Sequence, residues 1–92
     1  MAGEARHDAA RQRYELATEG GTAIAAYRRE GGVLDFTHTE VPEAMEGQGI
    51  GTQLVAGALA DVRAEGSKMR ASCPFVAAYV ERHPEVRDLL AG

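Results

Sequence analysis

Three glycines recur at alternate positions, Gly47, Gly49 and Gly51, immediately before a stretch with helical periodicity. Glycines let the backbone turn sharply and approach a ligand closely, and the free N–H groups of a helix N-terminus attract anions. The loop at 46–51 therefore predicts a phosphate-binding site. A strand-to-helix turn without a ligand could have the same composition, so this alternative stays open.

Two common phosphate-binding motifs do not fit this loop. A P-loop closes with Gly-Lys-Ser/Thr, whereas Gly51 is followed by Thr52 and Gln53. A dinucleotide-binding fingerprint has the spacing GxGxxG inside a βαβ unit, and here the third glycine comes one position too early. The predicted strands before the loop also form an antiparallel meander rather than a βαβ unit.

The only cysteine, Cys73, is the second residue with chemical potential. It lies between a predicted strand and Pro74, a residue that suits the first turn of a helix. A thiol at a helix N-terminus is stabilised as the thiolate and is therefore more nucleophilic. Cysteine is also among the most buried residue types and often only fills space. Both interpretations stay open.

The elements that position these residues begin with three predicted strands, at 13–16, 22–28 and 33–41. Each of the last two is rich in β-branched or aromatic residues, and turn signals or a proline follow all three. They read as an antiparallel meander. Residues 1–12 show little periodicity and are predicted to be a flexible leader before a single domain at 13–92.

The second half of the chain alternates helix and strand. Apolar residues at helical spacing predict a helix over 50–65, and Gly66 suits its C-terminal end. A short strand at 68–72 can then return parallel to the 33–41 strand through a right-handed crossover. A second helix over 75–83 and one further helical turn complete the order β-β-β-α-β-α. We expect an α+β domain with a mixed sheet and helices packed on it.

Composition excludes several classes of protein. Ninety-two residues allow one domain with one core, and a net charge of -4 argues against nucleic acid or an anionic membrane as the main partner. No segment resembles a signal peptide or a membrane span. One cysteine cannot form an internal disulfide, and soft ligands are too few for a structural zinc site, so no metal is expected. We expect a cytoplasmic protein.

The stretch 36–51 resembles motif A of the GCN5-related N-acetyltransferase (GNAT) superfamily, whose core is Gln/Arg-x-x-Gly-x-Gly/Ala. The segment Glu-Gly-Gln-Gly-Ile-Gly at 46–51 matches this core at Gly49 and Gly51 and departs from it at Glu46. His-Thr-Glu-Val-Pro at 38–42 and Ser-Cys-Pro at 72–74 further resemble a compact subfamily that retains only the coenzyme A-binding core. The resemblance covers residues 13–90 and implies a GNAT-like fold that binds acetyl-coenzyme A (acetyl-CoA).

The resemblance also implies which residues bind the cofactor. Backbone N–H groups of the loop would hold the pyrophosphate, and the pantetheine arm would lie along the strand end near Val41. The loop residues concerned are Gly47, Gln48, Gly49, Ile50, Gly51 and Thr52. A carboxylate at Glu46 would repel the pyrophosphate unless it turns to solvent; Arg63, Lys68 and Arg70 are candidates to offset that charge.

Two routes of acetyl transfer follow from the resemblance. In the first, Cys73 attacks the thioester, and an amine then attacks the acylated cysteine. In the second, the amine attacks directly, with Glu40 as general base and His38, two residues earlier on the same strand face, relaying the proton. The alternative is that His38 is an ordinary sheet-face histidine and Glu40 a solvated strand residue.

Three residues of the last helix and the leader complete the candidates. Tyr79 is a candidate acid for the departing thiolate, although the usual tyrosine position of the family falls on Val80; packing against the cofactor or the core is the other interpretation. His83, before Pro84, is predicted to cap the helix C-terminus. His7, in the leader, has no predicted role.

Two functions are compatible with these observations. The first is an N-acetyltransferase that transfers an acetyl group from acetyl-CoA to a primary amine of a small molecule, peptide or protein. The second is a non-catalytic coenzyme A-binding module, because the chain lacks the elements that build the acceptor pocket in larger relatives. A structural domain without a ligand is the third interpretation. A monomer or weak homodimer is expected, since a short edge strand could pair between chains.

Overall fold

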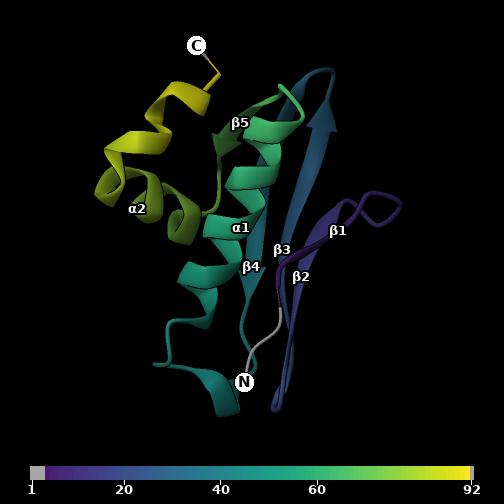
Figure 1. Cartoon of the computed structure of the whole chain (residues 1–92), viewed down its shortest axis with the longest axis vertical. Coiled ribbons are helices and arrows are strands. Elements are labelled where there is room, and N and C mark those ends of the chain that lie inside the picture. Colours follow the sequence, from purple (N-terminus) through teal and green to yellow (C-terminus); the bar gives the residue numbers. More distant parts are fainter. Residues whose placement is uncertain (1–3, 92) are drawn as a thin grey trace.

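The protein is described here from a computed structural model, which describes residues 4–91. They form one five-stranded sheet, in the order β1-β2-β3-β4-β5, with helices on one side (Figure 1). The elements in chain order are β1 (Arg6–Asp8), β2 (Arg13–Thr18), β3 (Gly21–Glu30), β4 (Val33–Glu40), the 3-10 turn η1 (Glu43–Met45), α1 (Ile50–Ala64), β5 (Lys68–Ala71), α2 (Pro74–Arg82) and the 3-10 segment η2 (Pro84–Leu89).

The sheet is mixed, as the sequence predicts. Strands β1 to β4 are antiparallel neighbours, and β5 lies parallel to β4 after the α1 crossover. The predicted α+β fold with its mixed sheet is therefore confirmed, and β1 is added to the predicted order. No helix in the described part of the chain is long and apolar enough to span a membrane.

A single core fills the space between the sheet and its helices. Strands β2 and β3 bury alternate residues, the pattern of a sheet that is covered on one face. The largest fully buried side chains are Tyr14, Leu16, Leu34, Phe36, Leu54, Val55, Leu59, Val62, Met69 and Val76. Both α1 and α2 lie on the same side of the sheet (Figure 1), so the described residues leave the other face uncovered.

Strand β1 is the main departure from the predicted elements. The prediction of a flexible leader over residues 1–12 does not hold for residues 6–8, which pair with β2 from Arg6↔Glu15 to Asp8↔Arg13. Tertiary contacts rather than local periodicity hold this strand, because the His7 ring stacks on Tyr14 with 4.3 Å between centroids. Residues 1–3, also part of the predicted leader, lie outside the described residues.

A β-bulge divides β4. Ala26 of β3 pairs with His38, whereas the next residue, Tyr27, pairs with Phe36, so Thr37 is an extra residue in β4. Because side chains alternate along a strand, one extra residue exchanges the two faces for all residues that follow. Phe36 is buried under the helices, and beyond the bulge His38 is exposed.

Strand β5 accompanies only the first half of β4. Their pairing ends at Phe36↔Ala71, and the backbone N–H of Cys73 then donates to the Phe36 carbonyl at 2.8 Å as the chain turns into α2. On its outer edge, β5 is covered by the C-terminus, where the N–H of Ala91 donates to the Met69 carbonyl at 2.9 Å. The second half of β4 therefore has one edge without a strand partner among the described residues.

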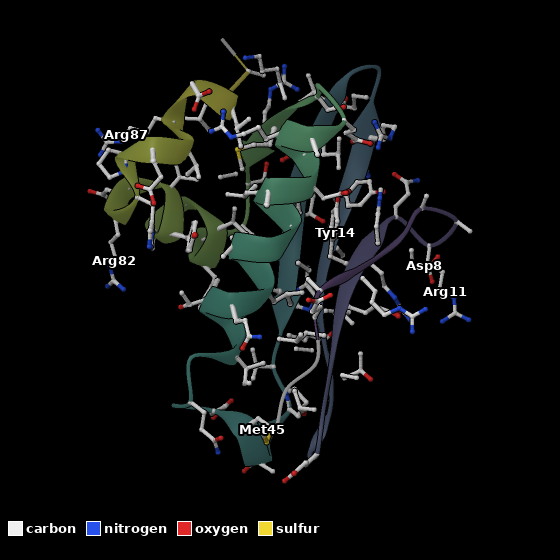
Figure 2. All side chains as sticks on the ribbon, in the orientation of Figure 1. Asp8, Arg11, Tyr14, Met45, Arg82 and Arg87 are labelled. Atoms are coloured by element: carbon white, nitrogen blue, oxygen red, sulfur yellow. The ribbon has the colours of Figure 1, made fainter. Side chains whose placement is uncertain are left out.

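The predicted helix ends are largely confirmed. Pro74 occupies the first turn of α2, with Cys73 as its N-cap residue, and Gly66 has a left-handed φ of 75° just past α1. His83 caps α2, since its Nδ1 hydrogen-bonds to the Tyr79 carbonyl at 2.8 Å. The expected final turn is η2, on the side of the molecule away from β1; Arg87 of η2 and Asp8 of β1 lie at opposite sides (Figure 2).

Candidate functional site

A cleft of about 400 Å³ opens at the N-terminus of α1, between the end of β4, the glycine loop and the start of α2. Met45 of η1, at the lower end of the molecule in Figure 2, also contributes to its lining. The predicted cofactor-binding residues that line the cleft are Val41, Gly47, Gly49, Ile50, Gly51 and Thr52. Gln48 and Tyr79 are not among the lining residues. The predicted loop and the predicted strand end thus meet at one hollow.

The loop backbone is shaped by two glycines. Gly47 and Gly49 have left-handed φ angles of 80° and 75°, a conformation that other L-residues adopt at a cost. Gly49 is the N-cap residue of α1, and its carbonyl accepts the first helical bond, from the N–H of Gln53 at 3.0 Å. Residues 50–52 lie between Gly49 and Gln53. Their N–H groups precede the first helical bond and therefore have no acceptor within the helix. They lie in the cleft lining and can bind an anion.

The third glycine has a different role. A Cβ atom on Gly51 would lie 2.6 Å from Cζ of Phe75, so the absence of a side chain lets the Phe75 ring pack against α1. Phe75 is 43% exposed and lines the cleft. Sequence analysis did not single it out; its only signal is an aromatic residue directly after the helix-starting Pro74. A ring at the entrance of a cleft offers a flat apolar surface to a ligand.

Beyond Phe75 lies a second hollow of about 260 Å³. Tyr79 lines it, and its ring stacks on the His83 ring with 3.9 Å between centroids. Burial, with a smaller contribution from Glu85, raises the pKa of the Tyr79 hydroxyl. Because Tyr79 packs here and not in the first cleft, the packing interpretation fits its position better than the role of an acid beside the thioester.

The second half of β4 contributes backbone as well as side chains to the cleft. Thr39 and Val41 line it, and no strand pairs with this edge of β4 beyond Phe36 in the described part of the chain. An exposed strand edge can accept an extended ligand by adding main-chain hydrogen bonds. The predicted position for the pantetheine arm therefore lies at a strand edge that no described strand occupies.

Cys73 lies behind the cleft wall rather than in it. Its Sγ is 3.5 Å from Oγ1 of Thr39, and only 6% of the residue is exposed. Burial raises the pKa of the Cys73 thiol, but hydrogen bonds from the Thr39 hydroxyl and from the backbone N–H groups of Val76, Phe75 and Thr39 together lower it by more. The net pKa lies below its ordinary value. Sequence analysis missed Thr39, since a regular strand would turn it away from Cys73.

Glu40 and His38 lie outside the cleft. They share a face of β4, as predicted, with 3.1 Å between Nε2 of His38 and Oε2 of Glu40. However, their side chains are 60% and 62% exposed, and neither residue lines the cleft. The bulge at Thr37 is the reason, because it turns the odd-numbered residues toward the helices in this half of the strand. The expected position of Glu40 beside the acyl group is therefore not found.

The three cations proposed to offset Glu46 are also elsewhere. Arg63 binds Asp88 with two bonds of 2.8 Å, Lys68 donates to the Asp88 carbonyl at 2.9 Å, and Arg70 pairs with Glu30 at 3.6 Å. Arg63 is near the C-terminal end of α1, roughly 20 Å along the helix from the loop at 1.5 Å per residue. Glu46 itself lines the cleft, so the charge conflict predicted from the sequence is not relieved by these residues.

Comparisons with known proteins agree with this geometry. The sequence matches the GCN5-related N-acetyl-transferase family Acetyltransf_CG over residues 13–89. It is 32% identical to Protein NATD1 of Gallus gallus over 84 residues, which is 88% of this chain and 76% of the relative. Protein NATD1 of Homo sapiens is 33% identical over 81 residues, which is 85% of this chain and 72% of the relative.

The fold has a solved counterpart. An NMR structure of a GCN5-like protein from Staphylococcus aureus superposes with a TM-score of 0.73 at 24% identity, covering 97% of this chain and 88% of that chain. The resemblance noted from the glycine loop is thus confirmed by the whole sequence and by the fold. The chain belongs to the GCN5-related N-acetyltransferase family, as a small single-domain member similar to NATD1.

Proposed function

We propose that this chain binds acetyl-CoA in the cleft at the N-terminus of α1 and transfers the acetyl group to a primary amine. One observation carries the proposal: a single cleft joins the free N–H groups of a helix N-terminus to a strand edge that has no strand partner in the described part of the chain. The first feature suits a diphosphate, and the second suits the amides of an extended pantetheine arm. Family membership supports acetyl-CoA as the molecule with both parts.

The charges of the cleft predict how the cofactor binds. Among the described residues that line it, none is lysine, arginine or histidine, and Glu46 is acidic. Backbone N–H groups must therefore carry the phosphate recognition. Because the whole chain has a net charge of -4, added salt screens repulsion of an anionic ligand. We expect the affinity for acetyl-CoA to hold or rise between low and moderate salt, rather than to fall.

Cys73 is the candidate nucleophile for the chemical step. Its thiolate would attack the thioester carbonyl, forming a bond from Sγ to the acetyl carbon while the bond to the coenzyme A sulfur breaks. The amine would then attack the acetyl carbon, expel the Cys73 thiolate and lose a proton to solvent. The lowered pKa of Cys73 and its contact with Thr39 in the cleft wall support this route. Direct attack by the amine is the competing route.

A pair of variants at Gly49 tests the binding site. Gly49→Glu places a carboxylate at the helix N-terminus, whereas Gly49→Asn makes a neutral change with a residue that tolerates left-handed φ. In calorimetric titrations with acetyl-CoA, Gly49→Glu should lose at least about tenfold in affinity, or about 1.4 kcal/mol. Gly49→Asn should lose less, and circular dichroism should show both variants folded. Undiminished binding by Gly49→Glu would place the cofactor elsewhere.

Intact-mass measurement tests the covalent route. The chain has one lysine, Lys68, so the Lys68→Arg variant leaves Cys73 and the N-terminus as the main nucleophiles. After incubation with acetyl-CoA, this variant should gain one acetyl group that hydroxylamine at neutral pH removes. Adding Cys73→Ala should abolish that gain. An acetyl group that hydroxylamine removes and that persists in the double variant would show that Cys73 is not the acceptor.

A non-catalytic coenzyme A-binding module is the second candidate function. It is favoured by the position of His38 and Glu40, because the acid–base pair predicted from the sequence lies outside the cleft. The measurement that separates the two functions is release of free coenzyme A with a panel of primary amines. Saturable binding of acetyl-CoA without any such release would favour the module.

A further inference from the structure

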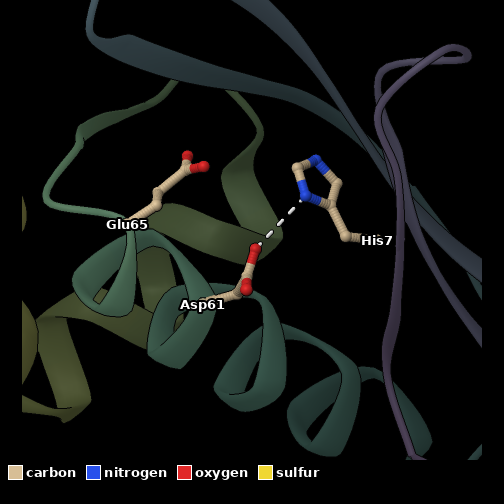
Figure 3. A group of neighbouring side chains, drawn as sticks. All are labelled: His7, Asp61 and Glu65. Atoms are coloured by element: carbon tan, nitrogen blue, oxygen red, sulfur yellow. Dashed lines mark ion pairs between the residues drawn. The ribbon is translucent and has the colours of Figure 1, made fainter.

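A cluster of polar side chains lies where β1 meets the second half of α1, away from the cleft. His7 of β1 faces Asp61 of α1 and Glu65, the C-cap residue directly after α1 (Figure 3). Each offers one ligand atom, and these atoms all lie within 4.8 Å of one another. We infer that His7, Asp61 and Glu65 form a binding site for one divalent transition-metal ion of the Zn²⁺ type. Sequence analysis predicted no metal site and assigned His7 no role.

The fold brings the three residues together by two independent means. Glu65, the C-cap residue of α1, lies four residues after Asp61, and its N–H donates to the Asp61 carbonyl at 3.0 Å, so the two side chains share one side of the helix end. The segment that carries His7 can approach that helix closely because residue 57 is glycine: a Cβ there would lie 2.7 Å from Cβ of Ala5. The pairing of β1 with β2 then fixes His7 opposite Tyr14.

Groups outside the cluster hold two of the ligands in place. His7 Nε2 hydrogen-bonds to the Tyr27 hydroxyl, which leaves Nδ1 directed toward Asp61 at 3.2 Å (Figure 3). The His7 ring is stacked on Tyr14, and the Tyr14 hydroxyl donates to Oδ2 of Asp61 at 2.6 Å. A histidine that binds a metal typically has its other ring nitrogen held by a hydrogen bond in this way. The site is thus oriented without an ion.

The ligand set determines the chemical class of the ion. One imidazole nitrogen and two carboxylates are ligands that Zn²⁺ and its neighbours accept, with ligand distances of about 2.0–2.2 Å. Tetrahedral geometry at those distances separates ligand atoms by about 3.4 Å, so the side chains need only close slightly around an ion. The side chain of His7 is 22% exposed and that of Asp61 44%, which leaves an open position for water.

Arg29 is the competitor for this site. Its guanidinium donates to Oε1 of Glu65 at 3.1 Å, so an ion must share or displace that contact. This competition gives the proposal a distinctive test. Removing Arg29 should strengthen metal binding, whereas removing Glu65 should weaken it. A cluster that serves only to hold β1 on α1 would not respond to metal in either variant.

The experiment uses the full chain, freed of metal by a chelator and titrated at about pH 7.5, because metal binding competes with protons at lower pH. Calorimetry with Zn²⁺ and absorption spectroscopy with Co²⁺ should both show one equivalent bound. Glu65→Gln and His7→Gln should each weaken binding at least about tenfold, while Arg29→Gln strengthens it. His38→Gln, a change to another exposed histidine, serves as the matched control and should bind as the original chain does.

Thermal unfolding provides a second measurement. Since a ligand that binds only the folded state stabilises it, Zn²⁺ should raise the Tm of the original chain and of His38→Gln, but not of Glu65→Gln. Circular dichroism establishes that each variant is folded before titration. Failure to saturate at millimolar Zn²⁺, or equal affinity of the original chain and Glu65→Gln, would overturn the inference. The outcome is independent of the acetyl-CoA cleft, which lies at the other end of α1.

Discussion

The two halves of β4 meet at Thr37 and differ in almost every respect. In the first half, Leu34 and Phe36 are fully buried under the helices, and strands pair on both sides. In the second half, β3 still pairs on one side, but the pairing with β5 has ended. At the boundary between the halves, the N–H of Cys73 bonds to the carbonyl of Phe36. One strand thus contributes to the core in its first part and to a cleft in its second.

The difference shows what a binding cleft requires of a sheet. A strand paired on both edges has satisfied its backbone N–H and C=O groups and has none to offer a ligand. Strand β5 ends before this half of β4, and the bulge at Thr37 turns Thr39 rather than His38 toward the helix side of the sheet. We conclude that the bulge, which leaves Thr37 out of the pairing with β3, determines which side chains of this half face the cleft.

The largest contrast between the halves should appear in stability. Phe36→Ala removes a fully buried ring and should lower the free energy of unfolding by about 3–5 kcal/mol, a large share of the total stability of a small domain. Glu40→Ala, beyond the bulge, should change it by less than about 0.5 kcal/mol because the residue is exposed. Urea unfolding measures both. Similar losses in the two variants would contradict the division of β4.

Deleting Thr37 tests the bulge itself. Without the extra residue, His38 follows Phe36 directly, so the pairs Tyr27↔Phe36 and Ala26↔His38 continue without a bulge. Thr39 then still faces Cys73 and Glu40 stays exposed, because the side chains alternate from Phe36 onward. Affinity for acetyl-CoA should therefore change less than about threefold. Thr37→Ala keeps the chain length and is the control, with near-normal binding expected. A loss of about tenfold or more in the deletion variant alone would contradict this assignment of the faces.

Local signals explain what could be predicted from the sequence. Helix α1 repeats apolar residues at helical spacing and is preceded by glycines, so its position and buried face were accessible. Strand β3 could also be placed from its local sequence, and so could the two ends of α2, from Pro74 and His83. The family resemblance, carried by the glycine loop, then led to the correct fold. Each of these features is encoded within a few neighbouring residues.

Features that depend on distant residues could not be predicted in this way. Strand β1 has three residues, and two of the contacts that hold it come from Tyr27 and Asp61, far along the chain. The bulge leaves no mark in composition, because Thr37 continues a strand-like sequence. Alternation of side chains therefore placed His38 and Glu40 on the wrong face of β4. The packing of Phe75 on Gly51 likewise exists only after α1 and α2 come together.

The Thr39→Val variant tests whether the Thr39 hydroxyl lowers the pKa of the Cys73 thiol. The variant keeps a similar shape but removes a hydrogen bond that lowers the pKa of Cys73, so that pKa should rise. The rate of alkylation by iodoacetamide, measured against pH, should shift its midpoint upward. Thr37→Val changes the neighbouring exposed threonine and should leave the midpoint in place. Coincident profiles for Thr39→Val and the original chain would show that Thr39 does not stabilise the thiolate.

The hydrogen bond between Thr39 and Cys73 also predicts that the stability of the fold depends on pH. Because the folded state lowers the pKa of Cys73, it binds the proton less tightly than the unfolded chain does. The stability from this shift is present above the ordinary cysteine pKa and is lost as pH falls through the lowered value. Thr39→Val should reduce that pH-dependent part. Urea unfolding at several pH values, with Cys73→Ala as the reference, measures it.

The smallest effect is expected on the outer face of β4. Glu40→Gln breaks the exposed pair with His38, and such pairs contribute little to stability, about 0–1 kcal/mol. Affinity for acetyl-CoA should change less than about twofold, because neither residue lines the cleft. Turnover with an amine should also persist, since nothing on this face reaches Cys73 in the described structure. A large fall in turnover at unchanged affinity would instead mean that the amine arrives from the uncovered face of the sheet, with Glu40 as its base.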